Sequence, residues 1–255
     1  MEFKEDTIGD IIESEGQMIL HGAERFGDYF INASEFNNLL NKFIKSIDDP
    51  TRFIFMLFLS QVKKHHILAL FSSVRLHHVQ AGMNLRQVME AGQWAAYALG
   101  NIEEEKFFDK DHNGIINTTG KHWGRMYKWL DENFKIKADE VKNIKKIISG
   151  SVGHSNIAYA FQNFKLGPPE KPSFSNTYFD EEDEYRVKTD LWFVANTAMG
   201  LLDLFYGVNL QYKVFQVEND FLPTIRKLTD QNHALKAEMA KHPRYQKALN
   251  LRSQK

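Results

Sequence analysis

A long stretch without proline, from Thr51 to Leu99, limits what this chain can fold into. Helix-compatible residues run through the whole stretch, and glycine occurs in it only at positions 82 and 92. A single helix of that length would measure roughly 70 Å, which is too long for a compact domain of this size. We therefore predict two helices here, with a break somewhere between Lys63 and Gly82.

The rest of the chain shows a similar helical pattern. Apolar residues recur at spacings of three and four, which is typical of amphipathic helices. The chain has only 6 prolines and 15 glycines, so long regular elements are favoured over a β-sandwich. We predict an all-α fold, a single bundle of seven to nine helices over residues 1–241. Its last helix is polar, and a basic tail follows at residues 242–255.

Local signals predict several helix boundaries. Residues 7–31 are expected to form one helix or two short ones, and Ser34 can cap the next helix. A long helix is expected over about residues 181–215, and the polar last helix over about residues 221–241.

Composition excludes several classes of site. The net charge of −1 gives no overall attraction to nucleic acid or to acidic membranes. The absence of cysteine excludes disulfides, thiolate zinc sites and cysteine nucleophiles. The sequence contains no G-x-S-x-G, no Gly-rich phosphate loop and no Rossmann fingerprint, so nucleophilic catalysis is not predicted. No cofactor is predicted either.

The apolar run from Leu191 to Leu210 is long enough to cross a membrane. It contains Asp203 and two asparagines, and an aspartate in the middle of a bilayer is costly. We therefore expect a buried helix in which Asp203 needs a partner such as Arg75, Arg86 or His154. The acidic N-terminal sequence has no signal-peptide pattern, so we expect a cytoplasmic protein without membrane contact.

The sequence DKDHNGIIN at residues 109–117 has two interpretations. An EF-hand calcium loop needs oxygen ligands at its first, third and fifth positions, here Asp109, Asp111 and Asn113. It also needs a glutamate at the twelfth position, where this chain has Gly120. The other interpretation is a surface turn in which Asp and Asn side chains bind local backbone and glycine supplies a positive φ. We favour the turn and keep calcium binding as an alternative.

Polar residues form a stripe on one face of the helix expected after residue 75. Steps of three, four and seven return to the same face, and Glu90 follows Arg86 by one turn. The stripe either faces solvent with an ordinary surface ion pair or lines a polar pocket floored by Arg86 and Glu90. The candidate ligand-binding residues of this stripe are Arg75, His78, Arg86, Glu90 and Gln93.

A second polar feature is the sequence SGSVGHSN, from Ser149 to Asn156, between two apolar helices. Its single His154 can serve as an acid or base near neutral pH, or can cap a helix. The basic segment from Lys236 to Lys255 can contact phosphates or remain a solvated tail.

The pattern R-x-x-x-E-A, from Arg86 to Ala91, followed by S-x-x-x-x-H, from Ser149 to His154, resembles a group of poorly characterised bacterial helical proteins. That group is loosely similar to the HEPN superfamily of helical RNases and nucleotide-binding modules. The resemblance covers about residues 51–164. It implies a helical bundle, a tendency to dimerise and a role in bacterial stress or defence. HEPN nucleases carry an Arg and a His four to six residues apart, whereas the nearest arginine before His154 is Arg125.

Three functional hypotheses follow from these features. The first is a non-catalytic helical module that binds a small ligand, a nucleotide or a protein through the stripe around Arg86 and Glu90 and the turn at His154. The second is a HEPN-like, metal-independent RNase with Arg86 and His154 as catalytic residues. The third is a calcium-binding protein that uses residues 109–117. We rank the first highest because each of the other two lacks an expected group.

Overall fold

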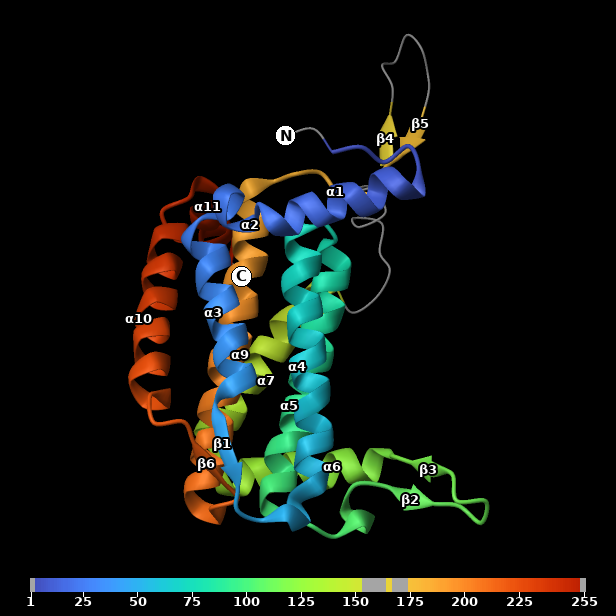
Figure 1. Cartoon of the computed structure of the whole chain (residues 1–255), viewed down its shortest axis with the longest axis vertical. Coiled ribbons are helices and arrows are strands. Elements are labelled where there is room, and N and C mark those ends of the chain that lie inside the picture. Colours follow the sequence, from blue (N-terminus) through green and yellow to red (C-terminus); the bar gives the residue numbers. More distant parts are fainter. Residues whose placement is uncertain (1–2, 153–163, 167–173, 253–255) are drawn as a thin grey trace.

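A computed structural model describes residues 3–152, 164–166 and 174–252 of the chain. Most of these residues lie in α-helices, so the predicted all-α, multi-helix fold is confirmed (Figure 1). The helices in the described part are α1 (Ile8–Leu20), α2 (Gly22–Phe26), α3 (Asp28–Lys42), α4 (Phe53–Val74), α5 (His78–Gly100), α6 (Gly120–Asn133), α7 (Lys135–Val152), α9 (Glu184–Tyr212), α10 (Phe221–Met239) and α11 (Pro243–Arg252).

The proline-free stretch forms two helices, α4 and α5, as predicted. The break falls at Arg75–His77, inside the expected interval. Leu76 there adopts a left-handed backbone with φ of 60°, and its side chain is buried. A non-glycine residue in this conformation costs on the order of 1 kcal/mol, so the surrounding contacts must hold the turn.

Two helix boundaries differ from those expected. Ser34 lies inside α3 and does not cap it, because the chain bends earlier, at Gly27, where φ is 54°. At the other end, most of the expected tail is helical, as α11. The described part therefore contains ten α-helices, more than the seven to nine predicted.

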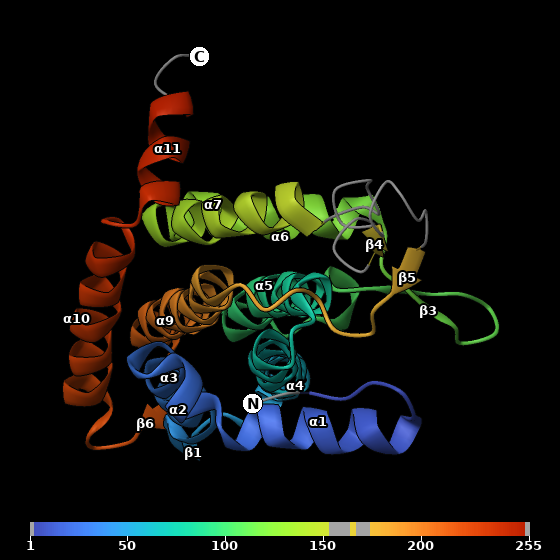
Figure 2. The same ribbon diagram turned by 90° about the horizontal axis from the view of Figure 1, so that it is seen from above.

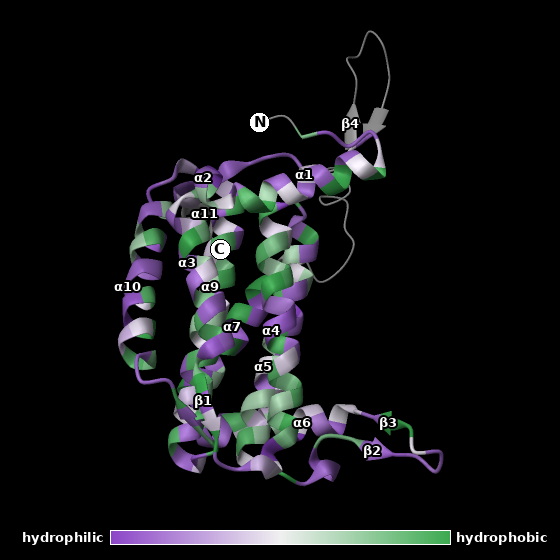
Figure 3. Cartoon of the chain, viewed as in Figure 1, coloured by the Kyte–Doolittle hydropathy of each residue, from purple (hydrophilic) through white to green (hydrophobic). Residues whose placement is uncertain are grey.

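The helices stack in three layers (Figure 2). The outer layers are α6 with α7 and α3 with α4, and α5 with α9 lies between them. Of the long helices, α5 has the largest share of buried residues. Figure 3 shows apolar residues on α4 and α9 as well. Gly92 of α5 allows close packing there, because a Cβ at this position would lie 2.5 Å from Leu201 of α9.

Three pairs of short strands occur in the described part of the chain, although no strand was predicted. The pairs are all antiparallel: β1 (Ile44–Ile47) with β6 (Phe215–Val217), β2 (Asp109–Lys110) with β3 (Ile116–Asn117), and β4 (Phe164–Leu166) with β5 (Phe174–Asn176). The β2–β3 hairpin projects from the end of the bundle near the start of α6 (Figure 1).

Two segments in the described part are long and apolar enough to cross a membrane by length and composition alone. They are Pro50–Val74 and α9, and their most apolar windows are 39% and 61% buried inside the protein. Core helices of soluble proteins pass the same test. Asp203 of α9 forms an ion pair with Lys137 of α7, which corrects the partners expected for it.

Candidate functional site

The N-terminal half of α5 has an open face. Residues 91–99 are all buried, whereas Gln80, Met83 and Gln87 are exposed on the first three turns. These three positions share one face because residues separated by three, four and seven return to the same side of a helix. The open face is therefore a surface that the other layers leave uncovered.

A groove of about 480 Å³ follows this open face. His65 of α4 forms one wall of the groove. The remaining lining residues all come from α5 and are Gln80, Met83, Asn84, Arg86, Gln87 and Glu90. Arg86 and Glu90, the centre of the predicted stripe, thus border a groove instead of lying on a flat surface.

Three charged side chains meet at one side of the groove. Arg86 Nε donates to Glu90 Oε1 at 3.1 Å, and Lys145 Nζ of α7 lies 3.2 Å from the same oxygen. Arg86 is 41% exposed, whereas Glu90 and Lys145 are about one-fifth exposed. Because one carboxylate serves two cations, the cluster carries a net positive charge.

Aromatic residues of α6 hold Lys145 in place. Its Nζ donates to the Tyr127 hydroxyl at 3.0 Å and lies 5.4 Å from the centre of the Trp123 ring. A second hollow, also of about 480 Å³, lies beside Tyr127 and is lined by Lys145 together with Lys142 and Lys146. Lys142 forms an ion pair with Asp131 of α6, so Lys146 is the lysine of this hollow that extends the positive charge away from Arg86 along α7.

Hydrogen bonds orient the polar side chains beside His65, at the wall of the groove that α4 forms. Asn84 Nδ2 donates to the Gln80 carbonyl at 2.9 Å, and its Oδ1 lies 2.9 Å from His65 Nδ1. Since an amide oxygen can only accept, His65 Nδ1 carries a proton and donates to Asn84. The Gln80 and Gln87 side chains make no hydrogen bonds to other described residues, so their amides are free for a ligand.

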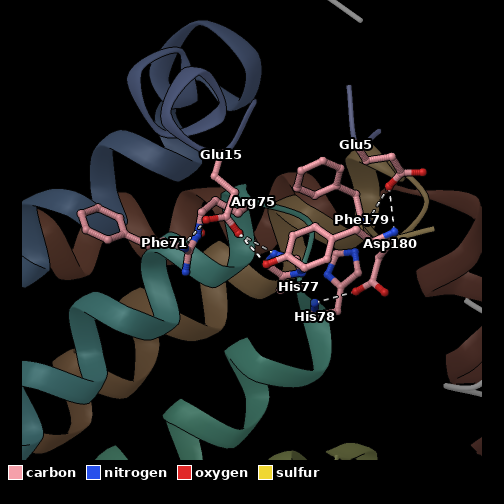
Figure 4. A network of polar contacts seen from close by, with 9 residues as sticks. Glu5, Glu15, Phe71, Arg75, His77, His78, Phe179 and Asp180 are labelled. Atoms are coloured by element: carbon pink, nitrogen blue, oxygen red, sulfur yellow. Dashed lines mark hydrogen bonds and ion pairs between the residues drawn. The ribbon is translucent and has the colours of Figure 1, made fainter. Parts of the chain in front are cut away.

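Arg75 and His78 belong to a different cluster, at the turn between α4 and α5 (Figure 4). Arg75 ends α4 and is not part of α5, so the predicted single stripe is interrupted. Its Nη1 lies 2.9 Å from Oε2 of Glu15 on α1, and His77 Nε2 lies 2.9 Å from the other oxygen. Burial raises the pKa of Glu15, but the hydrogen bond with His77 and the charge of Arg75 outweigh it and lower this pKa overall.

Two aspartates fix His78 at the first turn of α5. The His78 backbone N–H donates to Asp180 Oδ2 at 2.8 Å, and Nδ1 lies 2.5 Å from Oδ2 of Asp190 on α9. The His78 side chain is 1% exposed, and its Nε2 has no hydrogen-bond partner in the described part of the chain. The turn network therefore ties α1, α5 and α9 together and offers little surface to a ligand.

Gln93 lies in neither cluster. It is fully buried, and neither polar atom of its side chain has a hydrogen-bond partner among the described residues. It follows Glu90 by one turn but lies where α5 is covered on all sides. Of the five candidate ligand-binding residues, only Arg86 and Glu90 line the groove.

His154 lies outside the described residues, as does half of the turn expected at Ser149 to Asn156. The start of that turn differs from expectation, because the backbone from Ser149 to Val152 is helical and continues α7. The proposed meeting of Arg86 and His154 therefore stays a prediction.

The stretch 109–117 forms the β2–β3 hairpin. Asp111 Oδ1 accepts hydrogen bonds from the backbone N–H groups of Asn113 and Ile115, both at 2.8 Å, and Gly114 has a φ of 76°. Asp109 forms an ion pair with Lys121 of α6 at 3.0 Å. This geometry agrees with the turn interpretation. In the described ranges, no group of three or more His, Asp or Glu side chains is arranged to hold a metal ion.

Sequence reasoning missed the residues that complete the groove. Lys145 was detectable in principle, because Lys142, Lys145 and Lys146 recur at helical spacing on one face of α7. Nothing in the sequence indicated that His65, on the preceding helix, would face the same groove.

Comparisons with protein-family models, curated proteins and solved structures found no match for this chain, so its function has to be inferred from geometry.

Proposed function

We propose that this chain binds a nucleotide in the groove on α5, and that the groove is a binding site without catalytic function. The observation that carries the proposal is the sharing of Glu90 by Arg86 and Lys145 at the groove edge. One carboxylate cannot neutralise two cations, so a further anion is favoured there. A phosphate suits this position because the guanidinium group presents several donors in a plane and pairs with phosphate through two hydrogen bonds.

The rest of the groove suits a nucleobase. Gln80 and Gln87 are seven residues apart, which separates them by about 10.5 Å along the helix. Met83 lies between them and is 56% exposed. Amide side chains bind the polar edges of bases, and a thioether packs well against an aromatic ring. A base over Met83 would present its edges to the two glutamines while its phosphate reached Arg86.

The other hypotheses stay predictions. An RNase would use Arg86 together with His154, which is not among the described residues. Calcium binding at residues 109–117 would require the Asp109 and Asp111 carboxylates to exchange their present partners for an ion. Dimer formation, a cytoplasmic location and a role in bacterial stress or defence are likewise untested expectations.

Calorimetric titration with ADP in EDTA tests the proposal. We expect saturable binding that Arg86→Gln weakens at least tenfold, which corresponds to about 1.4 kcal/mol. The matched control is Lys128→Gln on α6, which removes a cation from an exposed pair with Glu132 and should leave the affinity unchanged. Equal affinities for the wild type and Arg86→Gln would contradict the proposal, as would the absence of binding by ADP, GDP and their triphosphates.

Glu90→Gln gives a second, more discriminating test. If Glu90 competes with the phosphate for Arg86 and Lys145, its neutralisation should tighten ADP binding several-fold. If Glu90 instead holds the two cations in position for the ligand, the same variant should weaken binding, and the charge argument would be wrong.

A further inference from the structure

A hydroxyl, an imidazole and a carboxylate lie in a row at the start of α6, in a cluster that includes none of the groove residues. Thr119 caps α6, and its Oγ1 lies 3.0 Å from His122 Nδ1. The Thr119 backbone N–H also donates to His122 Nδ1, at 3.0 Å. Because a backbone N–H can only donate, Nδ1 is unprotonated and Nε2 carries the proton. The Thr119 hydroxyl therefore faces the basic nitrogen of the ring.

A carboxylate lies on the other side of the ring. Asp109 of β2 places its Oδ1 3.6 Å from His122 Nε2, which makes no hydrogen bond to any described residue. The His122 side chain is fully buried, whereas Asp109 is half-exposed. A hydrogen bond from Lys121 lowers the pKa of Asp109, so this group is an anion at neutral pH. The ring is thus held between a hydroxyl and a negative charge.

Helix capping accounts for only part of this arrangement. Thr119 and His122 form a capping box, in which the side chain three residues after the cap binds back to the cap backbone. Glu or Gln usually fills that position. A capping box needs neither a buried imidazole nor a carboxylate behind it, so these two features call for another explanation.

We propose that Thr119, His122 and Asp109 form an acyl-transfer site that hydrolyses small esters, with Thr119 as nucleophile, His122 as general base and Asp109 as positioning residue. A nucleophile within hydrogen-bond reach of a base that a third group orients is the arrangement that activates hydroxyls in unrelated hydrolases. The backbone N–H groups of Gly120 and Lys121 have no partners within the helix, because they belong to its first turn. They lie next to Thr119 and can stabilise an oxyanion. A Cβ on Gly120 would meet no atom within 4 Å, so space for a substrate exists there.

The proposed reaction has two balanced steps. The backbone N–H of Thr119 first gives up its hydrogen bond to His122 Nδ1, because this nitrogen has only one lone pair. Thr119 Oγ1 then attacks the ester carbonyl and passes its proton to Nδ1, and the carbon–oxygen bond to the alcohol breaks as the alcohol takes that proton. Water next attacks the acyl-threonine, again giving a proton to Nδ1. That proton returns to Oγ1 as the acid leaves. In both steps Asp109 stabilises the transient imidazolium through Nε2–H.

Hydrolysis of p-nitrophenyl acetate by the full chain, combined with labelling by a fluorophosphonate and mass spectrometry, tests the site. We expect turnover above the buffer rate and a label on Thr119. Thr119→Val should abolish both, whereas Thr119→Ser should keep both. Thr118→Val is the matched control, because Thr118 is the exposed neighbour whose hydroxyl donates to the Phe107 carbonyl. Turnover that survives in Thr119→Val, or the absence of both turnover and label in the wild type, would overturn the proposal.

Two further variants separate catalysis from folding. Glutamine suits the third position of a capping box, so His122→Gln can keep the cap while it removes the base. It should lower kcat at least 100-fold, within the usual range for a general base. Asp109→Asn should lower kcat about tenfold without changing KM or the circular dichroism spectrum. Unchanged kcat in His122→Gln would contradict the role of the imidazole, and a change confined to KM in Asp109→Asn would contradict that of the carboxylate.

Discussion

The turn network around Arg75, His77 and His78 and the groove on α5 both lie on the hairpin of α4 and α5. Their charged side chains are paired in different ways. At the turn, Arg75, His77 and His78 each contact a carboxylate from another element, and their side chains are largely buried. In the groove, Arg86 and Lys145 share a single carboxylate. The side-chain amides of Gln80 and Gln87 there have no hydrogen-bond partner among the described residues. The turn has the properties of a structural joint and the groove those of a binding site. Variants at the turn should therefore change stability, and variants in the groove should change binding.

The largest effect is expected at Asp190, the partner of His78. Asp190→Ala leaves a buried imidazole N–H without an acceptor, which should lower the free energy of unfolding by about 2 kcal/mol. Urea denaturation measures this change. Asp230→Ala, an exposed aspartate on α10, is the control and should cost less than about 0.5 kcal/mol. A loss at Asp190 no greater than the control's would mean that the turn network does not hold the fold.

A dependence of stability on pH is expected from Glu15. Its folded pKa lies below the ordinary value of 4.5, so its contribution is present above that pH and is lost as the pH falls through the folded pKa. Glu15→Gln removes this contribution. Urea denaturation between pH 3 and pH 7 should show a shallower loss of stability in acid for the variant. Parallel pH profiles for the two proteins would contradict the assigned role of Glu15.

A smaller effect is expected at the base-binding end of the groove. Gln87→Ala should weaken ADP binding roughly threefold, about 0.6 kcal/mol, and leave inorganic pyrophosphate binding unchanged. Gln61→Ala, an exposed glutamine on α4, is the matched control. If Gln87→Ala weakened both ligands equally, the glutamine would not contact a base.

The smallest effect is expected for the stability of Arg86→Gln. An exposed ion pair one turn apart on a helix contributes about 0.3–0.5 kcal/mol. Urea denaturation should therefore give nearly the wild-type unfolding free energy. A loss of more than 1 kcal/mol would place Arg86 among the structural residues and remove the contrast between groove and turn.

The helical hairpin was predictable, but the way it divides the stripe was not. Helix length alone required a break in the stretch from Thr51 to Leu99. Its position could not be located, because Leu76 takes the left-handed conformation that glycine or asparagine would have indicated. Because α5 begins at His78, Arg75 lies outside this helix and is not part of the stripe. Its neighbour His78 is held by Asp180 and Asp190, more than 100 residues away, and no local pattern reports such contacts.

In the candidate sites too, the sequence predicted contacts within one helix but not contacts between distant segments. Arg86 and Glu90 pair within one helix, so their spacing predicted their contact. Lys145 joins them only because α7 packs on α5. Asp109 was considered for its oxygen atoms in a calcium loop, whereas the fold places it beside His122. Periodicity determines which residues share a helix face, and packing determines what that face meets.

The contrast between groove and turn is tested most directly by the thermal midpoint of unfolding with and without saturating ADP. A ligand that binds only the folded state raises this midpoint. We predict a clear rise for the wild type, the same rise from a lower starting midpoint for Asp190→Ala, and almost none for Arg86→Gln. A rise in Arg86→Gln equal to that of the wild type, or a rise lost only in Asp190→Ala, would contradict the assignment of binding to the groove and of stability to the turn.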